Sequence, residues 1–83
     1  MKLLYFAWVR QKIGRGEEQL ALPPNVRTIA QMIEVLRARG PGYQNAFAHP
    51  DRLRASLNQE HVRFDAEICD EDELAFFPPV TGG

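Results

Sequence analysis

The sequence ends in Gly82 and Gly83, two residues of the type that suits acyl chemistry at the main chain. Because glycine has no Cβ, its acyl carbon is unhindered and its backbone can enter a narrow channel. A carboxylate is itself a poor acyl electrophile. Joined to AMP as a mixed anhydride, it becomes one that a sulfur or nitrogen nucleophile can attack. We therefore expect a free carboxylate on Gly83 to be the reactive group of this protein.

The residues ahead of the two glycines favour an extended path. They are Pro78, Pro79, Val80 and Thr81. Proline holds φ near about −65° and favours a polyproline path, while β-branched residues prefer extended geometry. A stiff segment loses less conformational entropy when it enters a partner, and the tail 78–83 could reach roughly 20 Å. Most chain ends carry no function, but the complete ending 77–83 after an apolar strand favours the functional interpretation.

The composition limits the class of protein. The 83 residues predict one small domain, 1–83, and the 45% apolar and 25% charged residues are ordinary for a globular chain. A net charge of −1 gives no electrostatic reason to expect nucleic acid or an anionic membrane as a partner. One cysteine excludes an internal disulfide and a cysteine-based zinc site. The apolar start is too short for a membrane span and lacks the layout of a signal peptide, so we expect a cytoplasmic location.

Apolar periodicity predicts five strands. The nearly unbroken apolar run 2–8 predicts a central strand that is buried on both faces. A helical turn over 9–13 should end at Gly14 and lead into a second strand that pairs with the first as a hairpin. That second strand is expected near 18–22 and the remaining three near 53–58, 62–64 and 74–77, with turns at 58–60 and at the acidic run 70–73.

The main helix has the clearest signals. Thr28 and Gln31 match a capping box, and an apolar stripe follows at helical spacing. Gly40 and Pro41 should end this helix, and a short second helix is expected over 43–48. One helix lying across a mixed sheet, with the first and last strands paired in parallel at its centre, is an α+β fold of the β-grasp type.

The ending also carries a family resemblance. The run 74–83 resembles the end of the small, sulfur-carrier subunits of molybdopterin synthase, which are ubiquitin-like β-grasp proteins. Segments 6–10 and 57–59 resemble the first strand and the middle hairpin of that family. The acidic turn departs from the family, because Glu71 stands where glycine is usual. We expect that turn to need no positive φ.

The resemblance implies a mechanism and a set of partners. A ubiquitin-activating-like adenylyltransferase would use ATP and magnesium to adenylate Gly83, and a persulfide donor would replace AMP to leave a thiocarboxylate. The tail residues 78–82 would enter the large subunit of a two-plus-two heterotetramer. There sulfur would pass to cyclic pyranopterin monophosphate, twice, to build the dithiolene of molybdopterin. The resemblance implies no permanently bound cofactor or metal, and it places the catalytic residues in the large subunit.

Two aromatic residues are candidates for the partner interface. Strand alternation sends Phe76 and Phe77 to opposite faces, and we predict that Phe77 faces the partner. Phe6 could join it from the neighbouring strand. The alternative is that both phenylalanines of the last strand lie in the core.

Other polar residues give weaker signals. Nearby acidic residues disfavour a thiolate at Cys69, which favours a structural role over a redox role. His49 and His61 lack a metal-ligand pattern, so we expect them in loops or on the surface. The acidic run 70–73 could steer a basic groove of a partner or simply form a solvated turn. Three arginines could contact an anionic surface or belong to solvated strand faces: Arg52, Arg54 and Arg63.

Two alternative functions remain open from the residues. One is a carrier for thiamine synthesis or another pathway, or a ubiquitin-like modifier of lysines. The double proline at 78–79 favours the molybdopterin carrier over a thiamine carrier and over a protein modifier. The other is a binding module in which the two glycines are incidental.

Overall fold

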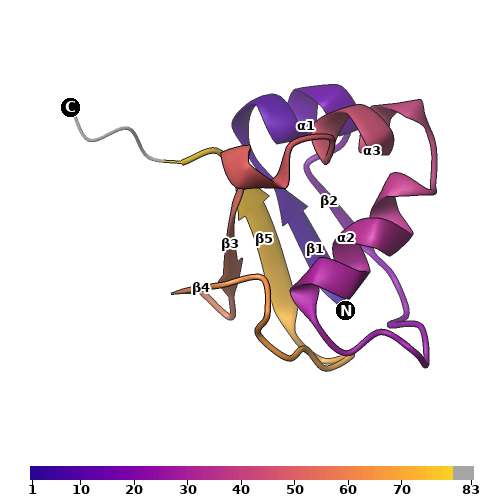
Figure 1. Ribbon diagram of the computed structural model, residues 1–83, viewed down its shortest axis with the longest axis vertical. Helices are drawn as coiled ribbons and strands as arrows, with labels where there is room; N and C mark the ends of the chain where they lie inside the picture. Colours follow the sequence, from indigo (N-terminus) through magenta and orange to yellow (C-terminus); the bar gives the residue numbers. More distant parts are fainter. Residues whose placement is uncertain (80–83) are drawn as a thin grey trace.

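A computed structural model describes residues 1–79 and shows a five-stranded mixed sheet with three α-helices (Figure 1). The strands lie in the order β2-β1-β5-β3-β4, and β1 and β5 pair in parallel near the centre. This confirms the α+β, β-grasp architecture. The elements are β1 (Lys2–Tyr5), α1 (Ala7–Ile13), β2 (Glu17–Gln19), α2 (Ile29–Arg37), α3 (Pro41–Ala46), the 3-10 turn η1 (Pro50–Arg52), β3 (Arg54–Leu57), β4 (Glu60–Val62) and β5 (Glu73–Phe77).

The first strand is shorter than the apolar run that predicted it. β1 ends at Tyr5, because Ala7 adopts a φ of 52° and the chain turns there into α1. Leu3 and Tyr5 are buried whereas Lys2 and Leu4 are partly exposed, so the prediction of burial on both faces is wrong. The residues after Tyr5 form a helix of seven residues instead of the single turn expected over 9–13.

Two glycines decide how α1 ends and how closely it is packed. Gly14 has a φ of 93° and its N–H donates to the Arg10 carbonyl at 2.8 Å, which confirms the predicted glycine stop. Gly42 of α3 lies against α1, where a Cβ would stand 2.6 Å from the Lys12 carbonyl oxygen. The missing side chain therefore allows α1 and α3 to approach each other closely.

The main helix begins as the sequence predicts. The Gln31 N–H donates to Thr28 Oγ1 at 3.3 Å and the Gln31 side chain accepts from the Thr28 N–H at 3.2 Å, so the capping box is complete. The end of α2 differs from the prediction, because Ala38 is the C-cap and Pro41 begins α3. Proline fits the first position of a helix, since its missing N–H has no partner there anyway.

The remaining turns and strands match their predictions to within a few residues. Asn58 and Gln59 have φ values of 51° and 72°, the geometry of a two-residue hairpin turn between β3 and β4. Glu71 is not among the residues with positive φ, which confirms that the acidic turn does not need the usual glycine. β2 covers three residues rather than the five expected at 18–22.

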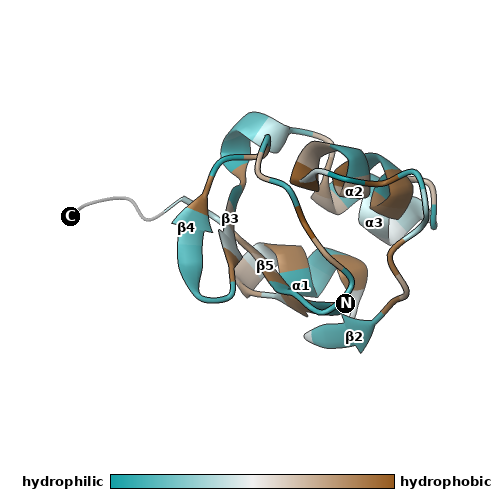
Figure 2. Ribbon diagram, turned by 90° about the horizontal axis from the view of Figure 1, so that it is seen from below, coloured by the Kyte–Doolittle hydropathy of each residue, from teal (hydrophilic) through white to brown (hydrophobic). Residues whose placement is uncertain are grey.

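The core lies between the sheet and the helices α2 and α3, which cover one of its faces (Figure 2). Phe76 is fully buried at its centre, stacked on Tyr5 with ring centroids 6.5 Å apart and meeting Phe47 edge-on at 5.0 Å. α1 lies at the end of the sheet where β1 and β5 finish (Figure 1). Within residues 1–79, no helix is long and apolar enough to cross a membrane.

Candidate functional site

Strand β5 carries the chain directly to the predicted tail. Phe77 is its last residue and pairs with Arg54 of β3, and Pro78 and Pro79 follow at the edge of the body (Figure 1). Both prolines are partly exposed. Val80, Thr81, Gly82 and Gly83 lie outside the described residues, so the reactive group that the sequence predicts at Gly83 stays a prediction.

The last strand separates its two phenylalanines as the alternation predicts. Phe76 is fully buried, whereas Phe77 is partly exposed and contacts the His61 ring with centroids 5.1 Å apart. The alternative that places both rings wholly in the core is therefore wrong for Phe77. Its predicted role at a partner interface is untested and stays a prediction.

Phe6 is 48% exposed, whereas the other large apolar side chains of residues 1–79 are buried or partly buried. The sequence predicts that Phe6 belongs to the first strand. The structure instead places it at the N-cap of α1. Its N–H donates to the Phe76 carbonyl at 3.1 Å, which fixes the backbone of Phe6 beside the end of β5. The structure thus places Phe6 near the point where the tail leaves the sheet.

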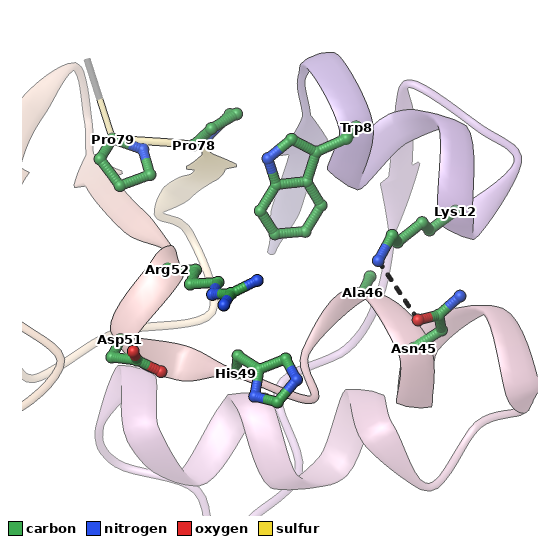
Figure 3. A pocket seen from close by; sticks show the side chains of 9 residues that line it. All are labelled: Trp8, Lys12, Asn45, Ala46, His49, Asp51, Arg52, Pro78 and Pro79. Atoms are coloured by element: carbon green, nitrogen blue, oxygen red, sulfur yellow. Dashed lines mark hydrogen bonds between the residues drawn. The ribbon is translucent and has the colours of Figure 1, made fainter. Parts of the chain in front are cut away.

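A cavity of about 530 Å³ lies at this same point, and it is here named the tail-root cavity (Figure 3). Pro78 and Pro79 form part of its wall. Trp8 and Lys12 of α1 contribute, and Lys12 Nζ lies 3.2 Å from Asn45 Oδ1 and 5.1 Å from the centre of the Trp8 ring. The other lining residues are Ala46, His49, Asp51 and Arg52. Sequence patterns could not reveal this cavity, because its walls come from three distant segments.

The acidic turn has structural partners that the sequence did not suggest. Asp70 Oδ1 accepts from the Leu22 N–H at 2.7 Å and from the Met1 ammonium at 3.3 Å. The bond from Leu22 and the ammonium charge hold the pKa of Asp70 below its ordinary value. Asp72 Oδ1 accepts from Asn58 Nδ2 at 3.0 Å. This turn stands at the start of β5, at the end of the sheet away from the tail (Figure 1).

Cys69 lies at the start of that turn. Its side chain is exposed, so the thiol does not pack in the core. The backbone N–H of Cys69 donates to Asp72 Oδ2 at 2.8 Å and thereby contributes to the turn. The structural contribution of this residue therefore comes from its main chain.

The two histidines and three arginines named from the sequence are all on the surface. His49 and His61 are exposed, as are Arg52, Arg54 and Arg63. Within residues 1–79, no three His, Cys, Asp or Glu side chains lie close enough together to hold a metal ion.

A buried carboxylate, which sequence reasoning missed, fixes the position of α3 against the sheet. The Glu18 side chain is only 4% exposed. Its Oε2 accepts from the Tyr5 hydroxyl at 2.8 Å and the Tyr43 hydroxyl at 2.7 Å, and its Oε1 accepts from Arg39 at 2.8 Å. Burial alone would raise the pKa of Glu18. The bonds from Tyr43, Arg39 and Tyr5 outweigh burial and lower that pKa below its ordinary value. A lone glutamate in a short strand gives no sequence signal for such a site.

Replacement of this carboxylate should destabilise the domain in a pH-dependent way. We expect Glu18→Gln to lower the free energy of unfolding by about 3 kcal/mol at pH 7, because Arg39 and two tyrosine hydroxyls lose a charged acceptor. A carboxylate with a lowered folded-state pKa stabilises the fold above its unfolded pKa, near 4.5, and this contribution disappears as pH falls through the folded value. The difference in unfolding free energy between wild type and Glu18→Gln should therefore become smaller as the pH falls below about 4.5.

Urea denaturation of both proteins at pH 7 and at lower pH measures this difference. A matched control is Glu34→Gln, which alters an exposed glutamate on α2 whose one ion pair within residues 1–79 is with Arg37. The control should change the free energy of unfolding by less than about 0.5 kcal/mol. Equal losses in the two variants would contradict the role given to Glu18.

Comparison with known proteins gives consistent results at the level of family, sequence and fold. The family described as the ThiS family matches residues 3–83. The molybdopterin synthase sulfur carrier subunit of Escherichia coli is 40% identical over 85 residues, which cover 100% of this chain and 99% of the relative. Both comparisons span essentially the full length of the chain.

Two solved structures have a similar fold. A protein from Pyrococcus furiosus described as a putative molybdopterin converting factor, subunit 1, is 31% identical, has a TM-score of 0.76 and matches over 95% of both chains. SAMP1 from Haloferax volcanii has a TM-score of 0.77 at 23% identity, over 100% of this chain and 98% of that chain. At this low identity, the second likeness shows the fold alone.

Proposed function

This chain belongs to the ThiS family, and on that premise we propose that it acts as the sulfur carrier subunit of molybdopterin synthase. The observation that supports this most strongly is the 40% identity, over the full length, to a bacterial protein with that name. The parallel pairing of β1 with β5, which aims the chain at Pro78 and Pro79, fits a protein that presents its last residues to a partner.

In the proposed reaction, the Gly83 carboxylate is the group that is activated and loaded. A ubiquitin-activating-like adenylyltransferase, with ATP and magnesium, converts it into an acyl adenylate and releases pyrophosphate. The outer sulfur of a persulfide donor then attacks the acyl carbon and AMP leaves, which gives an acyl disulfide. A second thiol, acting as reductant, attacks the donor's inner sulfur, so that a disulfide forms on the donor side and the thiocarboxylate is released on Gly83. This step needs an unhindered acyl carbon, which glycine provides.

The second half of the proposed reaction takes place in a large catalytic subunit. The tail 78–83 enters that subunit and brings the sulfur to cyclic pyranopterin monophosphate. Two such deliveries complete the dithiolene, in a two-plus-two assembly of carriers and large subunits. The folded body contributes by tethering the reagent, which replaces a bimolecular encounter with a local one.

Intact mass measurement tests the loading step. The carrier is incubated with the activating enzyme, ATP and a sulfur donor, and a gain of one sulfur-for-oxygen exchange is expected. An unchanged mass would favour a binding module. Conversion of the pyranopterin precursor by the loaded carrier and the large subunit would then separate this proposal from a carrier for thiamine synthesis or a protein modifier.

Truncation of Phe77 tests the proposed interface beside the tail. We expect Phe77→Ala to weaken binding to the large subunit roughly tenfold, because aromatic anchors dominate interface energies. The fold should persist, since this side chain is partly exposed and contacts the ring of His61, an exposed residue. Isothermal titration calorimetry measures the affinity, and Phe6→Ala should behave similarly. Unchanged affinity in both variants would argue against this interface.

A further inference from the structure

The cations of this chain fall into two groups. Five positive groups have an acidic partner within 4.0 Å among residues 1–79: the Met1 ammonium, Lys2, Arg15, Arg37 and Arg39. The other cations have no such partner in the described part of the chain, and two of them, Lys12 and Arg52, line the tail-root cavity; the rest are Arg10, Arg27, Arg54 and Arg63. Figure 3 shows the Arg52 guanidinium directed into the cavity between Trp8 and His49. Two charges without an acidic partner among the described residues therefore line the same cavity at the base of the tail.

The structure holds Lys12 in place without neutralising its charge. Lys12 Nζ bonds to Asn45 Oδ1, a neutral acceptor, and lies against the Trp8 ring. A side chain held in this way loses less entropy when it binds a ligand. Asp51 is the one acidic residue among the lining side chains, so two cations against one anion leave the cavity with one positive charge when His49 is neutral.

Charge is also divided between the two ends of the sheet. Arg54 adds a cation at the tail end of the sheet. Its backbone lies opposite Phe77 in the β3–β5 pairing, and its guanidinium donates to the Leu53 carbonyl at 2.8 Å. The acidic turn 70–73 stands at the other end of β5. The strand between them spans about 15 Å, which exceeds the screening length of about 8 Å at physiological salt. A protein approaching the tail therefore meets the positive end of this domain.

From this geometry we infer that the tail-root cavity receives an acidic side chain, Asp or Glu, of the protein that takes up the tail. The inference rests on the proposed function in one respect, which is that the tail enters a protein partner. Pro78 and Pro79 line the cavity, so any protein that encloses the tail must also cover it. The Trp8 ring and the prolines suit the apolar stem of such a side chain, while Arg52 and Lys12 suit its carboxylate.

Charge reversal at Arg52 tests this inference. The association of the carrier with the molybdopterin synthase large subunit of the same organism is followed by biolayer interferometry at low and high salt. We expect Arg52→Glu to slow association roughly tenfold at low salt, and we expect this difference to disappear at high salt, because rim charges act mainly on the association rate. Arg52→Lys keeps the charge and should restore most of the rate.

A matched control is Arg37→Glu, which makes the same change of charge at a partly exposed site on α2, away from the tail. The control should associate within about twofold of wild type, since it does not face the partner. Equal slowing of Arg37→Glu and Arg52→Glu, or no slowing of either, would overturn the inference. If wild type itself failed to bind the large subunit, the proposed function would fail instead. The same assay with the activating enzyme shows whether it too uses this cavity.

Discussion

Deletion of Gly83, or addition of one residue after it, is expected to abolish sulfur transfer while the domain stays folded. In the proposed mechanism the reacting atom is the last carboxyl carbon, so its position relative to the body and its lack of a Cβ both matter. A shift of one residue moves the reacting centre by up to about 3.5 Å, more than near-attack geometry allows. The expected loss is at least about a thousandfold in the rate of dithiolene formation.

The measurement is conversion of the pyranopterin precursor by each variant with the large subunit, after treatment with the activating enzyme, ATP and a sulfur donor. Thermal denaturation shows whether the fold is intact. Thr81→Ser is a suitable control, because it preserves the length of the tail and its final carboxylate. Normal dithiolene formation by a carrier whose last carboxyl group is amidated would refute the proposed chemistry.

Phe76→Ala is expected to produce the largest loss of stability. The ring is fully buried between Tyr5 and Phe47, so its removal leaves a cavity at the centre of the core. Large-to-small substitutions of this kind cost about 3–5 kcal/mol, and small domains have only about 5–15 kcal/mol in total. We expect the variant to be at the margin of folding at 25 °C, with a clearly lower midpoint in urea.

The neighbouring residue provides the control for this prediction. Phe77→Ala removes the same side chain one position later, where the ring is partly exposed on the opposite face of β5. Its loss of unfolding free energy should be less than half of that for Phe76→Ala. Similar losses of unfolding free energy in both variants would contradict the different contributions that we assign to the buried Phe76 and the partly exposed Phe77.

Predictions from the sequence were most accurate where the signal is local. The capping box at Thr28 and Gln31, the glycine stop at Gly14 and the hairpin turn at Asn58 each depend on residues within a few positions of one another. Boundaries were less accurate. The apolar run 2–8 predicts one strand, whereas the backbone turns at Ala7, because docking of α1 against α3 overrides local preference.

The sequence by itself determined the order of the elements, which follows from periodicity and turn residues, and it indicated the family through the resemblance of the ending 74–83. The tertiary structure alone decided three further features. It buried the Glu18 carboxylate against Tyr5 and Tyr43, which lie 13 and 25 positions away along the chain. It also paired Asp70 with the Met1 ammonium, 69 positions away, and assembled the tail-root cavity from three segments. Such contacts form only when distant segments pack together, and no local pattern encodes which distant groups will meet.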